Sequence, residues 1–226
     1  MFRFVHRSIF ESEEEKLLCS NPQSAVLNAS PGPLHANGDT IMHISTPSCI
    51  LRTWSVSDAP SLSIHANNPD IARWMRDGFP SPYSRDDADR FIAMAQNEQI
   101  AILLAIEVDG EAVGGIGIHP LSDVYRRTAE IGYWLSQKYQ GRGVVTDAVR
   151  ACVPVVFATT DIIRIQAGVF HTNLSSMRVL EKCGFEHEAV HTKAIWKHGQ
   201  FLDEHLYVLF RDRYESRKEP NARTLN

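Results

Sequence analysis

The sequence predicts a mixed α/β fold, in which helices flank one mostly antiparallel sheet. Runs rich in apolar and β-branched residues alternate with stretches of helical period from about residue 41 onward. Asp109-Gly110 and His198-Gly199 separate pairs of strand-like runs, which is typical of antiparallel hairpins. A glycine-rich turn at residues 140–143 joins a strand-like run to a helical one. No internal repeat or second domain is apparent.

The first half of this region is expected to hold a strand, three helices and a hairpin. Ser57 or Asp58 is a candidate N-cap for the first helix, and Ser84 or Asp86 for the third. Residues 79–83 are expected to be extended, because proline disfavours helix at the residue before it. The expected strands cover residues 50–54, 100–108 and 111–119, and the helices residues 59–66, 70–76 and about 84–96.

The second half is expected to continue as strand, helix, strand, helix and a last hairpin. The run at 162–170 is almost wholly apolar, which is typical of a strand inside a sheet. Gly184 is a natural helix terminator. The expected strands cover residues 129–135, 162–170, 185–196 and 200–211, and the helices residues 144–158 and 175–182.

The 226 residues are interpreted as one domain with two tails. Residues 21–40 are rich in Pro, Ser, Asn and Gly without apolar periodicity, so residues 1–40 are predicted to be a poorly ordered leader. The domain is predicted to span residues 41–215, and residues 216–226 to form a C-terminal tail.

Composition excludes several classes of function. The formal net charge is -4 and no basic stripe is present, which argues against nucleic acid as a partner. No apolar run approaches the roughly 20 residues of a membrane span. The four cysteines form no CxxC pair and no metal set with histidine, so no metal is expected. Reduced thiols and the acidic N-terminal segment, which is unlike a presequence, favour a cytoplasmic protein.

The strongest chemical signal is the segment KYQGRG, residues 138–143, placed before a helix. A helix N-terminus presents unpaired N–H groups, and glycine lets the backbone approach a bulky anion closely. The segment therefore predicts a pyrophosphate site, although two glycines alone commonly do no more than turn the chain. No GK[ST] follows and a third glycine is missing, so neither a Walker loop nor a dinucleotide fingerprint is present.

Two longer stretches give this segment its context. AEIGYWL at residues 129–135 followed by YQGRGVVTDA at 139–148 resembles the acetyl-CoA signature of the GNAT superfamily, with Lys138 where Gln or Arg is usual. NLSSMRVLEKCGF at 173–185 resembles a segment of its ribosomal-protein N-acetyltransferase branch. The resemblance covers about residues 48–215.

The resemblance implies a sheet that splays open between its fourth and fifth strands, with acetyl-CoA as co-substrate in the gap. The pantetheine would pair with the fourth strand through the backbone of Trp134 and Leu135. The cofactor-binding residues that it implies are Trp134, Leu135, Lys138, Gln140, Gly141, Arg142, Gly143, Val144, Asn173, Ser176 and Arg178.

The catalytic residues implied by the resemblance are Glu130 and Asn173. Glu130 is expected to be the base, directly or through water, unless it merely pairs with Arg126 or Arg127. Asn173 is expected to contact the pantetheine or a water, or simply to cap the next helix. Leu180 stands where many relatives have a tyrosine acid, so no acid is identified, and His119 is an alternative base.

The predicted function is transfer of acetyl from acetyl-CoA to a primary amine by direct attack in a ternary complex. A protein or peptide N-terminus is favoured as acceptor, and a small-molecule amine is possible. The alternative is an inactive CoA-binding module of the same fold. The protein is expected to be a monomer or homodimer.

Overall fold

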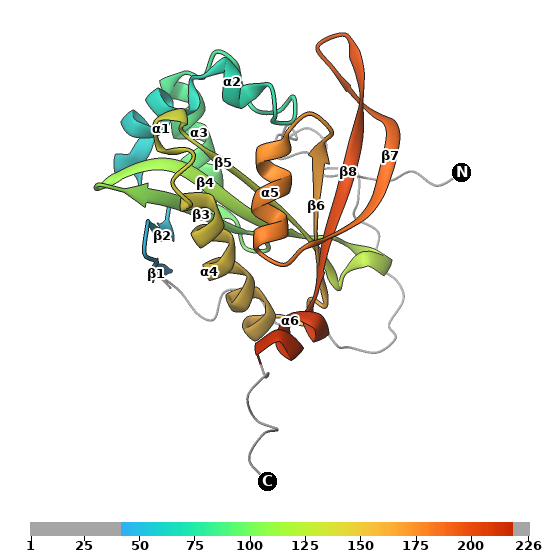
Figure 1. The fold of residues 1–226 in the computed structure, drawn as a ribbon. Coiled ribbons are helices and arrows are strands. Elements are labelled where there is room, and N and C mark those ends of the chain that lie inside the picture. The colour runs from blue at the N-terminus through green and yellow to red at the C-terminus, as the bar shows by residue number, and fades with distance from the viewer. Residues whose placement is uncertain (1–41, 219–226) are drawn as a thin grey trace, which may run out of the picture.

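An eight-stranded sheet in the order β1-β2-β3-β4-β5-β6-β8-β7 organises the computed structural model, which describes residues 42–218 (Figure 1). The predicted leader, residues 1–40, lies outside the described residues, as does most of the predicted tail. The strands are β1 (His43–Ser45), β2 (Ile50–Thr53), β3 (Ile102–Val108), β4 (Glu111–Pro120), β5 (Thr128–Leu135), β6 (Arg164–Phe170), β7 (Glu186–Lys197) and β8 (Gln200–Phe210). The mixed, mostly antiparallel sheet is thereby confirmed.

The sheet comes apart between β5 and β6, its only parallel neighbours in the described chain. Only residues 128–130 of β5 pair with residues 164–166 of β6. Beyond the pair Glu130–Gln166 the strands run on to Leu135 and Phe170 without pairing to each other. Since these are the predicted fourth and fifth strands, the predicted splay is present at the predicted place.

Helices cover the two faces of the sheet differently (Figure 1). The larger core lies between the sheet and the helices α4 (Val144–Thr159) and α5 (Leu174–Lys182). A smaller core joins α1 (Ala59–Ala66) and α3 (Arg85–Asn97) to the opposite face near Trp54 and Trp134. Among described residues, this smaller core takes nothing from β6, β7 or β8. That face of the last three strands is therefore left uncovered by it.

The predicted cap of the first helix is wrong in one respect. Asp58 stands at the N-cap of α1 but makes no capping hydrogen bond. Its carboxylate instead accepts from Arg52, at 2.7 and 2.8 Å, and from the amide of Ser55. The helix is entered through a 3₁₀ turn, Val56–Asp58, which is capped by Ser55, and the bond from the Ser55 amide to Asp58 completes the capping box of this turn. Ser84 caps α3, as one of the two predicted candidates.

Three elements differ from the sequence prediction. The helix expected at 70–76 is the short α2 (Pro69–Ala72), because 3₁₀-type bonds from Trp74 to Ile71 and from Met75 to Ala72 replace its continuation. The short edge strand β1 and the helix α6 (Arg211–Lys218) were not predicted. No helix among residues 42–218 is long and apolar enough to cross a membrane.

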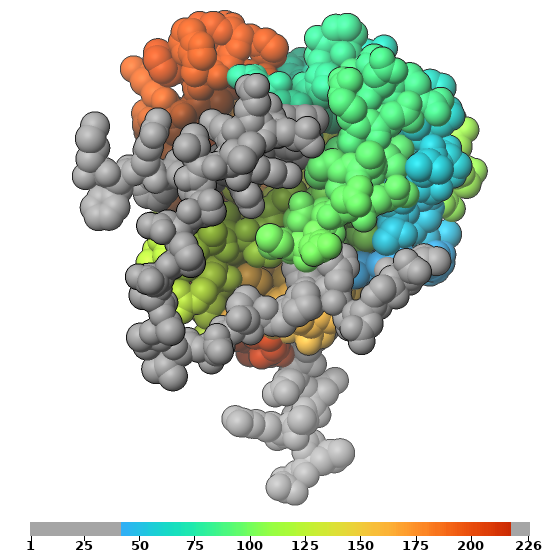
Figure 2. Space-filling model, turned by 180° about the vertical axis from the view of Figure 1, so that it is seen from behind, coloured from blue at the N-terminus to red at the C-terminus, as the bar shows by residue number. Residues whose placement is uncertain are grey.

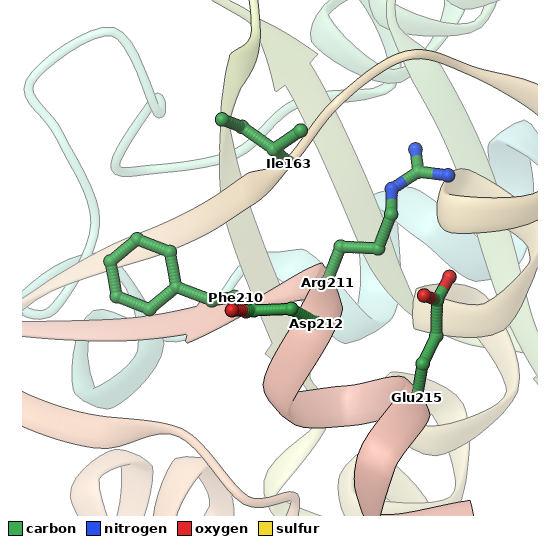
Figure 3. Close-up of a pocket in the computed structure, with 5 residues that line it drawn as sticks. All are labelled: Ile163, Phe210, Arg211, Asp212 and Glu215. Atoms are coloured by element: carbon green, nitrogen blue, oxygen red, sulfur yellow. The ribbon is translucent and has the colours of Figure 1, made fainter.

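A pocket of about 290 Å³ lies where α6 begins, lined by Ile163, Phe210, Arg211, Asp212 and Glu215 (Figure 3). The guanidinium of Arg211 donates to the carbonyls of Phe157, Thr160 and Ile162, at and just beyond the end of α4. The pocket adjoins the first residue of β6, whereas the gap between β5 and β6 opens towards its last residues. Its arginine has a structural role, as a cap for the C-terminus of α4.

Candidate functional site

The edge of β5 that faces the gap carries backbone groups without a partner among residues 42–218. Ser136 N–H donates to Val113 at 2.8 Å and Leu121 N–H to Thr128 at 2.8 Å, which fixes the hydrogen-bonding phase of β4 and β5. In an antiparallel pair every second residue turns both backbone groups to its partner. Tyr133 and Leu135 therefore turn theirs toward the gap, where the pairing with β6 has already ended. This edge can accept an extended ligand as an added strand.

The same register changes one expectation from the sequence. Trp134 is the partner of Gly115, so its N–H and C=O point at β4 and not into the gap. Its indole packs on the smaller core, with a ring-centroid distance of 6.0 Å to Phe79. The backbone contact with the pantetheine that was expected from Trp134 is therefore expected from Tyr133 instead, because only the odd-numbered residues of β5 turn their backbone groups toward the gap.

The turn before α4 forms an open anion cradle beside this edge. Gly141 and Gly143 have φ values of 75° and 84°, which L side chains rarely adopt, and a Cβ on either would meet no atom of the described residues within 4 Å. Gly143 is the N-cap of α4 and makes no side-chain capping bond. From Gly141 to Thr146 no backbone N–H has an acceptor within the described part of the chain. These donors and the helix dipole fit a pyrophosphate group.

The other predicted residues of the segment surround this cradle. Lys138 and Arg142 are exposed and lie over the ring of the buried Tyr139, 5.1 and 5.7 Å from its centroid. Gln140 donates to the carbonyl of Leu135 at 2.9 Å, which ties the turn to the end of β5. Val144 is buried in the core, so only its backbone is available to a ligand.

Helix α5 approaches the gap from the side of the larger core. Asn173 caps α5, accepting from the amide of Ser176 at 3.2 Å, so the capping alternative is realised. The hydroxyl of Tyr133 lies 2.9 Å from that of Ser176 and links β5 to α5. Burial raises the pKa of Tyr133, which keeps this hydroxyl protonated. Arg178 is exposed, and no described residue forms an ion pair with it.

Glu130 lies on the opposite face of β5 and is bound by an arginine that the sequence did not point to. The guanidinium of Arg76, between α2 and α3, donates to Glu130. The predicted alternative partners are engaged elsewhere, since Arg126 donates to Asp123 and Arg127 to Asp161. Arg76 was not identifiable beforehand, because 54 residues separate it from its partner.

His119 is the strand partner of Glu130 and shares its face of the sheet. Burial lowers the pKa of its imidazole below the ordinary 6.5 and nearby Arg76 lowers it further, while Glu98 has a smaller opposing effect. No hydrogen bond to the His119 ring is found among residues 42–218. A neutral, unpartnered imidazole at pH 7 is suited to accepting a proton.

Comparison with known proteins gives consistent results. The family model described as acetyltransferase (GNAT) domain matches residues 49–186. The chain is 36% identical over 101 residues to the probable N-acetyltransferase YjcK of Bacillus subtilis, covering 45% of this chain but only 56% of that relative. It is 29% identical over 174 residues to the putative ribosomal N-acetyltransferase YdaF of Bacillus subtilis, covering 74% and 94% of the two chains. The solved structure of the microcin C7 self immunity acetyltransferase MccE in complex with acetyl-CoA and AMP superposes with a TM-score of 0.63 at 26% identity, covering 73% of this chain and 93% of the other.

Proposed function

The chain belongs to the GNAT acetyltransferase family, and from this premise we propose that it transfers acetyl from acetyl-CoA to a primary amine. The observation that carries the proposal is the free edge of β5 beside the open N-terminus of α4. One element offers a strand edge to a pantetheine and the other offers amides to a pyrophosphate. A protein or peptide N-terminus is the favoured acceptor, since the relative YdaF is named a putative ribosomal N-acetyltransferase.

The proposed binding roles follow from position. The amides of residues 141–146 hold the pyrophosphate, and Lys138, Arg142 and Arg178 add positive charge around it. Tyr133 and Leu135 align the pantetheine through their backbone groups. The bound thioester supplies the activated acetyl group. Most of the rate enhancement then comes from holding two reactants together, worth about 7–11 kcal/mol in favourable cases.

Two groups are candidates for the base that takes the proton of the amine. Glu130 is the residue predicted from the family resemblance, but Arg76 occupies its carboxylate. The imidazole of His119, on the same face of the sheet, has a lowered pKa and no hydrogen-bond partner in the described part of the chain. These features favour His119 as the proton acceptor, with Glu130 and Arg76 as positioning residues beside it. Glu130 as a base acting through water is the competing proposal.

The direct test measures CoA release from acetyl-CoA with a panel of N-terminal peptides, polyamines and aminoglycosides, beside calorimetric titration with acetyl-CoA. Saturable, acceptor-dependent release is expected, together with binding of acetyl-CoA. Tight binding without turnover on any acceptor would instead support an inactive CoA-binding module. The buried Leu180, where many relatives carry a tyrosine acid, is the observation that favours this second candidate.

A further inference from the structure

Three glycines lie side by side on the face of the sheet that α4 and α5 do not cover. Gly117 of β4 is the strand partner of Gly132 of β5. Gly132 and Gly168 of β6 each follow the last β5–β6 pair, Glu130–Gln166, by two residues, so they stand at the same level on either side of the opening gap. Because side chains alternate along strands, all three positions face the same way as Glu130.

Side chains of neighbouring residues fill the space above two of the three glycines. At Gly117 an added Cβ would lie 2.8 Å from Nε2 of His119. At Gly168 it would collide with the carboxylate of Glu204, whose side chain reaches across from β8. At Gly132 it would meet no atom of residues 42–218 within 4 Å. The open position over Gly132 is therefore flanked by an imidazole on one side and a carboxylate on the other.

The carboxylate of Glu204 is only half engaged. Oε2 lies 2.9 Å from Nδ1 of His191 on β7, while Oε1, the oxygen nearest Gly168, has no hydrogen-bond or ion-pair partner within residues 42–218. The Glu204 side chain is 29% exposed. Seen from behind, the β7–β8 hairpin and the α2–α3 region form the two upper corners of this face (Figure 2). A carboxylate oxygen without a partner at such a place attracts cations.

We propose that Glu204 binds a second positive charge of the acceptor while the reacting amine lies over Gly132. The inference rests on the proposed function and narrows its substrate class to amines with two cationic groups. Neighbouring strands lie about 4.8 Å apart and β5 and β6 diverge here, so the second charge is expected roughly 5–8 Å from the reacting nitrogen. Short diamines and polyamines have this spacing, as do peptides with lysine after the N-terminal residue.

The test compares matched acceptors with wild-type protein and Glu204→Gln. The pairs are 1,4-diaminobutane with butylamine, and an Ala-Lys peptide with an Ala-norleucine peptide. With Glu204→Gln, KM for the dicationic member of the preferred pair is expected to rise about tenfold, with kcat and the KM for the monocationic member within twofold of wild type. The pair with the larger effect identifies a free polyamine or a peptide as the source of the second charge.

Two control variants separate recognition from structure. Glu188→Gln makes the same change in charge on β7, at a carboxylate that Arg164 binds where β5 and β6 are still paired. It should leave unchanged the ratio of KM for the monocationic acceptor to KM for the dicationic acceptor. His191→Gln removes the partner of Glu204 but keeps its charge, so the preference for dications should persist.

Three other outcomes would contradict either the role of Glu204 or the proposed function. Turnover with equal KM ratios in wild type and Glu204→Gln overturns the role of Glu204 and leaves the proposed acetyl transfer standing. Loss of the preference in His191→Gln as well as in Glu204→Gln shows that their pair only shapes the hairpin, which also overturns it. Absence of acetyl transfer to any acceptor refutes the proposed function and this inference together.

Discussion

Gly141→Glu is expected to weaken CoA binding by about 100-fold, by a mechanism that can be separated from loss of stability. Gly141 has φ 75° and no atom of residues 42–218 lies within 4 Å of an added Cβ, so the new side chain meets no obstacle there but strains the backbone. That strain costs about 1–2 kcal/mol. For a chain of this size it lowers Tm by about 2–8 °C. The larger effect is electrostatic, because a carboxylate would stand beside the pyrophosphate that we propose the cradle binds.

The size of the electrostatic effect follows from Coulomb's law. Two unit charges about 6 Å apart at an effective dielectric of about 20 repel by about 3 kcal/mol. This corresponds to a Kd for CoA raised by about 100-fold. Raising the salt concentration should recover part of the affinity, because exposed charges are screened.

Gly110→Glu is the matched control. Gly110 lies in the β3–β4 turn with φ 82°, and an added Cβ there also meets nothing within 4 Å in the part of the chain that the structure describes. It is four residues from Gly114, the partner of Leu135, or about 13 Å along the strand. Both variants should lose similar thermal stability, and only Gly141→Glu should lose CoA affinity in calorimetric titration. Equal Kd values for the two variants would refute the cradle.

Three further predictions concern His119 and Arg211. Dividing the kcat of the wild type by that of His119→Gln cancels titration of the acceptor, and because burial lowers the pKa of His119, this ratio should stay level down to below pH 6.5 and then fall. Glu130→Gln should keep the fall of kcat at low pH that the wild type shows. A ratio for His119→Gln that does not change with pH would exclude His119 as the base. As the pH falls, His119 is protonated in the unfolded chain before it is protonated in the folded protein, so its contribution to folding stability is lost between pH 6.5 and its lower folded-state pKa. The Tm of His119→Gln should therefore fall less over that pH range than the Tm of the wild type. Arg211→Met should lower the free energy of unfolding by about 2–3 kcal/mol in denaturant titration, because carbonyls at the end of α4 lose a charged donor, while CoA affinity stays within twofold. A fully stable Arg211→Met would show that water replaces the guanidinium.

Local signals in the sequence predicted most of the fold. Alternation, turn dipeptides and caps act over a few residues, and they located every strand except β1 and every α-helix except α6 of the described chain, although not the short 3₁₀ helices. The edge strand β1 has only three residues, too few for a recognisable period. Helix α6 has an unusually polar sequence, and Arg211 at its start is held by contacts about 50 residues away in the chain. Such contacts leave no local pattern.

The candidate site divides in the same way. The glycine turn and the start of α4 could be identified from consecutive residues, because the geometry of an anion cradle is set within one turn of helix. The sequence did not indicate that the backbone groups of Tyr133 face the gap, because this depends on the register between β4 and β5. It did not indicate the pair of Arg76 with Glu130 either, since nothing near Arg76 marks its partner.

The sequence by itself determined the kind of fold, the place of the splay and the segment suited to a pyrophosphate, because each depends on local backbone preference or on a family motif of consecutive residues. Only the tertiary structure decided which backbone groups face the gap and that Arg76 forms an ion pair with Glu130. It also placed His119 and Glu204 on either side of the open position over Gly132. Those features arise where separate segments of the chain come together, and their free energies depend on distances that no short stretch of sequence specifies.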